Sequence, residues 1–333
     1  MPTPIVQLPN AIPLPHEGGS EDLLGLWSDL ESGLSMVLAY PQAAHEFPHK
    51  ILQYDQWMQT LVRQDGDTAL FLLFQLASTS SVGYSASHAL VCATLCHLVA
   101  VELGLNPPER DALVRAAMTM NIAMTQLQDE LALQAEKLSP VQRAMVNRHT
   151  EEGALLLRRL GVFDGMWLQL VEHHHVESGG GNRSPAWNSL AQPLQLPHIL
   201  AAIDRYAAMI SPRANRSGRS ASDSVGLLVD ARDGGYLTTI GHALQRAIGR
   251  FPPGSFVRLA SGETAVVVQN GQRVETPDVA VLRDSEGKVL KQPRLQAQAS
   301  EIRESLTHDQ AALPHGYLRL LQIGVRARRV FKG

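Results

Sequence analysis

The sequence predicts a mainly α-helical protein, in which N-terminal helices and a helical bundle precede a small antiparallel β-rich extension. Apolar residues recur every three or four positions from Glu21 to about Ile248, which is the period of an amphipathic helix. Short β-rich runs separated by turns follow the segment Phe251-Pro252-Pro253-Gly254. With 333 residues, of which 44% are apolar, the chain can bury a sizeable core in one large domain or two ordinary ones.

Five regions are expected along the chain. Residues 1–20 are rich in proline and polar residues and are expected to lack a fixed structure. An N-terminal helical region covers 21–79, the bundle covers 80–249, the β-rich extension covers 250–292, and a helical tail with a basic end covers 293–333. Within the first helical region, Asp65-Gly66-Asp67 predicts a break before a helix over Thr68–Leu76.

The bundle contains one helix after another. Ser87 is expected to cap a helix from His88 to about Leu103, and Asn106 with two prolines starts the next, which runs to about Met124. Ser139-Pro140 begins a third helix that Gly161 ends. Four further helices are predicted over residues 163–176, 196–210, 220–231 and 237–248.

The extension reads as an antiparallel meander. Its predicted strands are Val257–Leu259, Thr264–Gln269 and Val279–Leu282. Turn signals such as Ser261-Gly262 and Asn270-Gly271 separate these runs. The residues after them return to a composition compatible with helix.

Composition narrows the possible functions. The chain has 32 acidic and 29 basic residues and a net charge of -3, which argues against a nucleic-acid-binding protein. Its two cysteines, Cys92 and Cys96, lie in an apolar run and are expected to be free and buried, as in a reducing compartment. That run, Ala89–Leu105, is interrupted by His97 and Glu102, so we expect no membrane span and a cytoplasmic protein.

Histidine is the most informative residue type. His173-His174-His175 stands at the end of a predicted helix, just before the glycines at 179–181. Imidazole is a common ligand of zinc, iron and manganese, and glycine lets the backbone leave helical geometry at little cost. The alternative is a solvated histidine cluster that interacts with the helix dipole, and the triplet alone leaves both readings open.

A succession of motifs surrounds the triplet. In chain order these are Tyr84–Leu90, Arg115–Met124, Leu138-Ser139-Pro140, Asn147–Gly153, the triplet with its glycines, Ile203–Met209 and Arg213–Arg216. Their order and spacing resemble the HD-GYP family, the all-helical, metal-dependent phosphodiesterases of the HD superfamily that hydrolyse cyclic di-GMP. The resemblance covers roughly residues 80 to 245, and the strand-rich segment after Phe251 also looks like the tail common in that family.

The resemblance implies a set of site residues. The expected metal ligands are His88, His149, His173, His174 and Asp204. Arg213 and Arg216 match the basic pair that contacts the dinucleotide phosphates, and guanidinium groups suit that role. The loop glycines Gly179 and Gly181 complete the ligand-binding residues.

The departures from the family pattern concern its signature. Met120-Asn121 stands in place of the family's His-Asp, and Met124 in place of a lysine. Asn182 and Arg183 replace the tyrosine and proline of the glycine loop, and His175 replaces the glutamate after the paired histidines. Since the missing aspartate bridges two ions in the family, we expect one divalent transition-metal ion (iron, manganese or zinc) or none. His149, His173 and His174 would hold that ion, which leaves His88 and Asp204 as a pair.

The expected function is a degenerate HD-GYP-type signalling protein with no catalytic residues at the signature. It would act by binding a protein partner, with cyclic di-GMP as a candidate ligand. One alternative is an active but atypical metal-dependent phosphodiesterase, with Asp204 or Glu177 as general base. A second is a structural interaction protein that keeps only the scaffold. A zinc site of His88, Cys92 and Cys96 is less favoured, because zinc sites seldom take all their ligands from one helix face.

Overall fold

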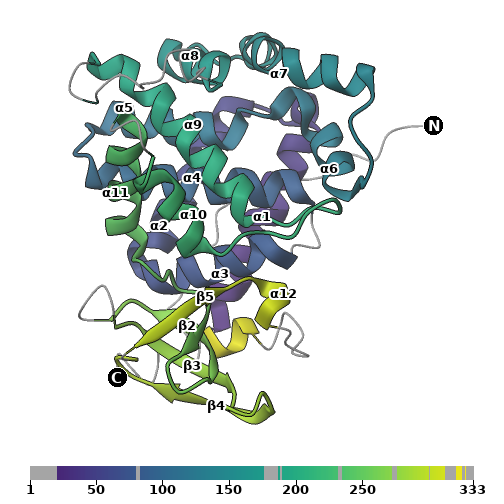
Figure 1. The fold of residues 1–333 in the computed structure, drawn as a ribbon. Helices are drawn as coiled ribbons and strands as arrows, with labels where there is room; N and C mark the ends of the chain where they lie inside the picture. Colours follow the sequence, from purple (N-terminus) through teal and green to yellow (C-terminus); the bar gives the residue numbers. More distant parts are fainter. Residues whose placement is uncertain are drawn as a thin grey trace.

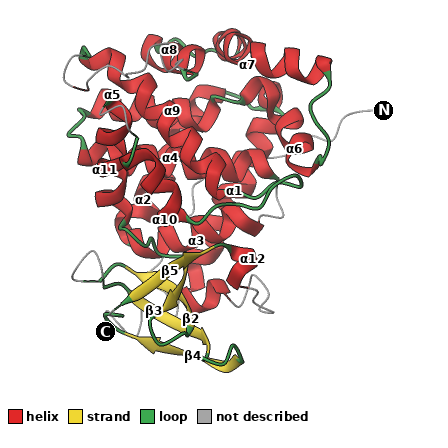
Figure 2. Ribbon diagram, in the orientation of Figure 1, coloured by secondary structure: helices red, strands yellow, loops and turns green. Residues whose placement is uncertain are grey.

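A layer of packed helices lies against one small β-sheet (Figures 1 and 2). The computed structural model describes residues 21–79, 83–175, 187, 190–231, 235–271, 276–299, 301–311, 320–324 and 327. Within them the mainly α-helical fold with a C-terminal antiparallel sheet is confirmed. The prediction of disorder for residues 1–20 lies outside the described residues.

The N-terminal helices share the core of the bundle. They are α1 (Glu21–Ala39), α2 (Phe47–Gln64) and α3 (Gly66–Thr79). Asp65 forms the predicted break, since its carboxylate accepts hydrogen bonds from the backbone N–H and hydroxyl of Thr68. Trp27, Phe47 and Phe71 are almost fully buried in one apolar cluster with residues of the later helices. Residues 21–79 therefore do not pack as a separate body.

Helix α4 (Tyr84–Glu102) is the central helix and begins earlier than predicted. The Ser87 hydroxyl donates back to the Gly83 and Tyr84 carbonyls, so Ser87 lies inside the helix and the predicted cap is wrong. Asp129, on α6 (Thr125–Leu133), accepts at 2.7 Å from both the backbone N–H and the hydroxyl of Ser85. Among the described helices α4 alone is long and apolar enough to cross a membrane, but 83% of its apolar window is buried inside the protein.

The helix starts predicted at Asn106 and at Ser139-Pro140 are confirmed, and both are capping boxes. Asn106 and Glu109 cap α5 (Pro107–Thr119), and Ser139 and Gln142 cap α7 (Pro140–Arg159). Helix α5 ends at Thr119, before the predicted boundary, and the short 3₁₀ turn η2 (Ile122–Met124) leads directly into α6. The remaining helices are α8 (Gly165–His173), α9 (Gln192–Ile210), α10 (Ala221–Val229) and α11 (Tyr236–Ile248).

The sheet has five strands in the order β4-β3-β2-β1-β5. They are β1 (Phe256–Leu259), β2 (Thr264–Gln269), β3 (Asp278–Arg283), β4 (Val289–Gln296) and β5 (Ile302–Leu306). The first three match the predicted meander. A helical tail over 293–333 is wrong in its first part, because β5 pairs antiparallel with β1 and closes the sheet's other edge. Helix α12 (His308–Ala311) and the helical residues 320–324 follow.

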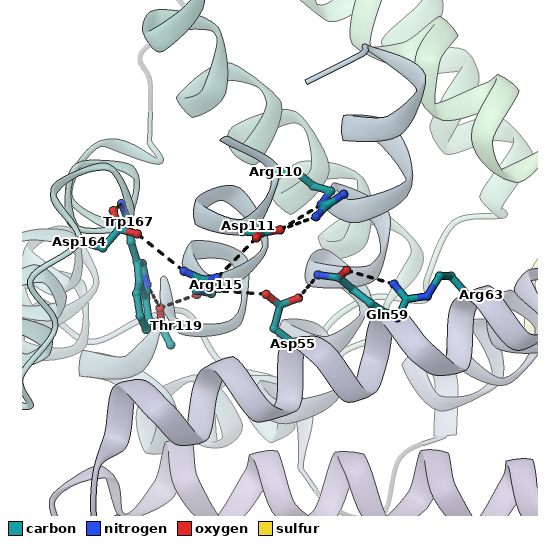
Figure 3. Close-up of polar contacts among 9 residues, drawn as sticks. All are labelled: Asp55, Gln59, Arg63, Arg110, Asp111, Arg115, Thr119, Asp164 and Trp167. Carbon is teal, nitrogen blue, oxygen red and sulfur yellow. Dashed lines mark hydrogen bonds and ion pairs between the residues drawn. The ribbon is translucent and has the colours of Figure 1, made fainter. Parts of the chain in front are cut away.

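A polar network ties α2, α5 and α8 together (Figure 3). The guanidinium of Arg115 on α5 lies 3.6 Å from the buried carboxylate of Asp55 on α2 and 3.8 Å from Asp164, the residue that caps α8. Near the end of α5, the Thr119 hydroxyl accepts a 2.8 Å hydrogen bond from the indole N–H of Trp167. These contacts fix α8 against α5, and α8 ends at the histidine triplet.

Candidate metal centre

Two segments bring three imidazoles together. His149 extends from α7, and His174 and His175 follow the last residue of α8. The Nε2 atoms of His149 and His174 are 3.2 Å apart, and the His175 ring centre is 5.0 Å and 4.3 Å from theirs. His149 and His174 are both 1% exposed, whereas His175 faces solvent. Their ligand nitrogens all lie within 4.8 Å of one another.

Backbone carbonyls determine which nitrogens are free to bind a metal. Nδ1 of His149 lies 2.5 Å from the Val146 carbonyl oxygen, and Nδ1 of His174 lies 2.8 Å from that of Val171. A carbonyl only accepts, so each Nδ1 carries the proton and each Nε2 presents a lone pair. Burial lowers the pKa of both rings, that of His174 to about 3, so a proton between them is disfavoured at neutral pH. Two lone pairs 3.2 Å apart therefore fit a divalent cation, and a hydrogen bond from the other ring nitrogen to a carbonyl oxygen is typical of histidine ligands.

The structure places one member of the predicted ligand set, His173, apart from the other imidazoles. His173, the last residue of α8, is exposed, and its Nδ1 donates to the Gln169 carbonyl one turn back at 3.0 Å. Successive helical side chains point about 100° apart, so His173 and His174 cannot face one point while the helix continues. The adjacent pair that joins His149 is His174 and His175.

A second cluster lies between α4 and α9. His88 Nε2 is 2.8 Å from Asp204 Oδ1 and 3.5 Å from the sulfur of Cys92, one helical turn further along α4. His88 is 3% exposed, and its Nδ1 has no hydrogen-bond partner among the described residues. The structure thus brings the predicted pair His88 and Asp204 together and adds a thiol. The i,i+4 spacing of His88 and Cys92 was the sequence signal for that contact.

The carboxylate of Asp204 interacts electrostatically with histidines of both clusters. Burial alone would raise the pKa of Asp204, but the hydrogen bond and charge of His88, with the nearby rings of His174 and His175, lower it to about 2. Asp204 is therefore ionised at neutral pH. Its negative charge also favours the charged forms of His149 and His174.

The predicted phosphate-binding arginines lie in a tight turn after α9. The guanidinium of Arg213 donates to the Tyr84 hydroxyl at 2.9 Å and lies 4.8 Å from the centre of its ring. Tyr84 in turn stacks on His88, with ring centres 5.5 Å apart. Arg216 is exposed and donates to the Ala208 carbonyl. Gly179, Gly181 and Glu177 lie outside the described residues.

The signature positions add no ionisable ligand to either cluster. Met120 is 1% exposed in the apolar core, and Met124 is half-buried. Asn121 lines a small cavity with Leu38 and Gln128, and the lining of that cavity contains no residue of either cluster.

Comparisons with known proteins show which family this chain belongs to and which proteins it is similar to. The family model described as "HD domain" matches residues 71–237. A protein of Pseudomonas aeruginosa, cyclic di-GMP phosphodiesterase PA4108, is 29% identical over 226 residues, which is 66% of this chain and 53% of that protein. The chain therefore spans about half the length of the curated relative it matches. The solved structure of Bd1817, an HDG"Y"P protein from Bdellovibrio bacteriovorus, has a TM-score of 0.50 at 15% identity, over 69% of this chain and 74% of that one. This second likeness concerns the fold.

Proposed function

The chain belongs to the HD domain family, and from that premise we propose a signalling protein of the HD-GYP type that binds one divalent ion in its histidine cluster, and cyclic di-GMP, but hydrolyses the dinucleotide poorly or not at all. The observation that carries the proposal is the pair of Nε2 lone pairs of His149 and His174, 3.2 Å apart, in a fold whose signature positions hold Met120 and Asn121.

The three imidazoles of His149, His174 and His175 would hold the ion. A neutral nitrogen donor set favours borderline transition metals such as iron, manganese or zinc over magnesium or calcium. When bound, such an ion neutralises phosphate charge and polarises phosphate oxygens. The protein's own contribution is to orient the rings through the Val146 and Val171 carbonyls.

Impaired hydrolysis follows from the residues at 120 and 121. Two-metal phosphodiester hydrolysis needs a group that holds two ions about 3.5 to 4 Å apart. Asn121 carries no charge, and Met120 packs into the core, so neither supplies that bridge. The active alternative is weaker for a further reason: Asp204, with a pKa of about 2, is a poor proton acceptor at neutral pH.

Arg213 supports the nucleotide part of the proposal. The Arg213 guanidinium donates to the hydroxyl of Tyr84, whose ring stacks on His88, and Arg213 Nε is buried without a hydrogen-bond partner among the described residues. A phosphate oxygen would satisfy that donor, and charge-assisted contacts of this kind are strong. Because a module that binds without turnover transmits a signal only through another molecule, a protein partner is part of the proposal.

The test combines binding and turnover on one preparation. Calorimetric titration of protein loaded with manganese or iron should show cyclic di-GMP binding that weakens at least tenfold in Arg213→Met. Arg219→Met is the matched control, because Arg219 is an exposed arginine of the same segment. Product chromatography, with an active phosphodiesterase as reference, should show little or no hydrolysis. Absence of binding by the wild type would refute the ligand, and turnover at the rate of the reference would refute the impairment.

A further inference from the structure

We propose that Cys92 adds a thiolate ligand to the expected ligands His88 and Asp204, so that these three residues form a second metal site selective for zinc and chemically similar ions. The site takes two ligands from α4 and one from α9, so it does not depend on a single helix face. It depends on the HD-domain fold but not on cyclic di-GMP binding.

The geometry of the two α4 ligands already matches tetrahedral zinc. With Zn–S of about 2.3 Å and Zn–N of about 2.05 Å, a tetrahedral angle places sulfur and nitrogen about 3.6 Å apart. The observed separation of Cys92 Sγ and His88 Nε2 is 3.5 Å. Asp204 Oδ1, at 2.8 Å from His88 Nε2, would move outward by about 0.6 Å to reach the corresponding separation of about 3.4 Å. The Asp204 side chain is 22% exposed and so has room for that movement.

Charge supports the same assignment. A thiolate and a carboxylate balance the charge of a divalent ion, and the His88 imidazole binds as a neutral ligand. On binding, the thiol proton leaves to solvent and the His88 proton moves from Nε2 to Nδ1, so that Nε2 can coordinate.

Sulfur also defines the class of ion. Thiolate ligands favour zinc, cobalt(II) and iron(II) over magnesium and calcium, which prefer oxygen. Three protein ligands leave one tetrahedral position open.

Cobalt(II) provides a readout that does not depend on activity. Cobalt bound to a thiolate absorbs intensely in the near ultraviolet, whereas cobalt bound only to imidazole and carboxylate does not. Wild-type protein titrated with cobalt should show this band and bind two ions per chain. Cys92→Ser should lose the band and one ion. Cys96→Ser is the matched control, because Cys96 is equally buried one turn further along α4 but belongs to neither cluster.

A second variant and a second measurement keep the test decisive. His174→Ala disrupts the histidine cluster, so it should lose one ion and keep the thiolate band. X-ray absorption of wild type loaded with two zinc ions per chain, which needs no variant, should show sulfur at about 2.3 Å, on average one sulfur for every two zinc ions. Cobalt binding without a thiolate band, a band that survives in Cys92→Ser, or a zinc spectrum without sulfur would each overturn the site. Cyclic di-GMP titration of the same samples separates failure of this site from failure of the proposed function.

Discussion

Replacing Asp55 by asparagine should stabilise the protein at neutral pH. Asp55 is 1% exposed, and burial raises the pKa of its carboxyl from 3.8 to about 6, although Gln59 and Arg115 act in the opposite direction (Figure 3). A carboxyl with a higher pKa in the folded than in the unfolded state contributes stability that is complete below 3.8 and is lost as pH rises through 6. The change in pKa corresponds to about 3 kcal/mol of unfolding free energy at neutral pH.

Urea denaturation of Asp55→Asn and wild type across this pH range measures the effect. The asparagine keeps an oxygen for Gln59, and Arg115 remains 3.7 Å from Asp111 and 3.8 Å from Asp164. The unfolding free energy of the variant relative to wild type should therefore rise by about 2.4 kcal/mol between about pH 4 and pH 7. A difference that is flat with pH, or that falls as pH rises, would refute the reasoning. Asp111→Asn, with a side chain 29% exposed beside the same arginine, should show no comparable trend.

Three further changes probe other features. Thr119→Val deprives the buried indole N–H of Trp167 of its acceptor and should lower the unfolding free energy by about 1 to 3 kcal/mol, measured in urea. Burial lowers the pKa of His97 to about 4, so its contribution to stability is present above 6.5 and is lost as pH falls toward 4. In His97→Leu the unfolding free energy should therefore fall less than in wild type as pH decreases from 6.5 to 4. Gly218→Ala would place a methyl group against the Ile210 carbonyl oxygen and should weaken cyclic di-GMP binding in calorimetry by displacing the arginine turn.

Each of these changes has a counterpart that isolates its cause. Thr119→Ser keeps the hydroxyl and should cost much less than the valine variant. An added methyl group at Gly226, inside α10, meets nothing within 4 Å, so Gly226→Ala should leave nucleotide binding unchanged. An unchanged fall with decreasing pH in His97→Leu, or full nucleotide affinity in Gly218→Ala, would show that the inferred contact does not control the measured property.

Local signals explain which helices could be predicted. The capping boxes at Asn106 and Ser139 operate within four residues, and the structure contains both. The start of α4 was missed because its acceptor, Asp129, lies 44 residues further along the chain than Ser85. Strand β5 was missed because it pairs with β1 across more than forty residues, and its charged alternation resembles a solvated helix as much as an edge strand.

In the candidate site, too, local sequence signals were informative and contacts between distant segments were not. Motif order identified His88, His149 and Asp204, and the structure places each in a cluster. Three adjacent histidines in the sequence do not show at which residue α8 ends. The position of that helix end decides whether His173 or His175 lies beside His149 and His174. Sequence also could not show that Cys92 lies beside Asp204, because that contact depends on how α4 and α9 pack.

The two clusters indicate that ion binding and phosphodiester hydrolysis have different requirements in this fold. Ion binding needs lone pairs and balanced charge, and in the proposed second site the Cys92 thiolate and the Asp204 carboxylate would supply that charge. Hydrolysis by two metals needs a group that spans both ions, as the two oxygens of a carboxylate can. The contacts of Cys92 in its cluster are with His88 and Asp204, and the histidine trio forms a separate group. If both proposals hold, an exchange of this kind would preserve the charge balance but remove the bridge, which is why metal content and turnover are measured separately.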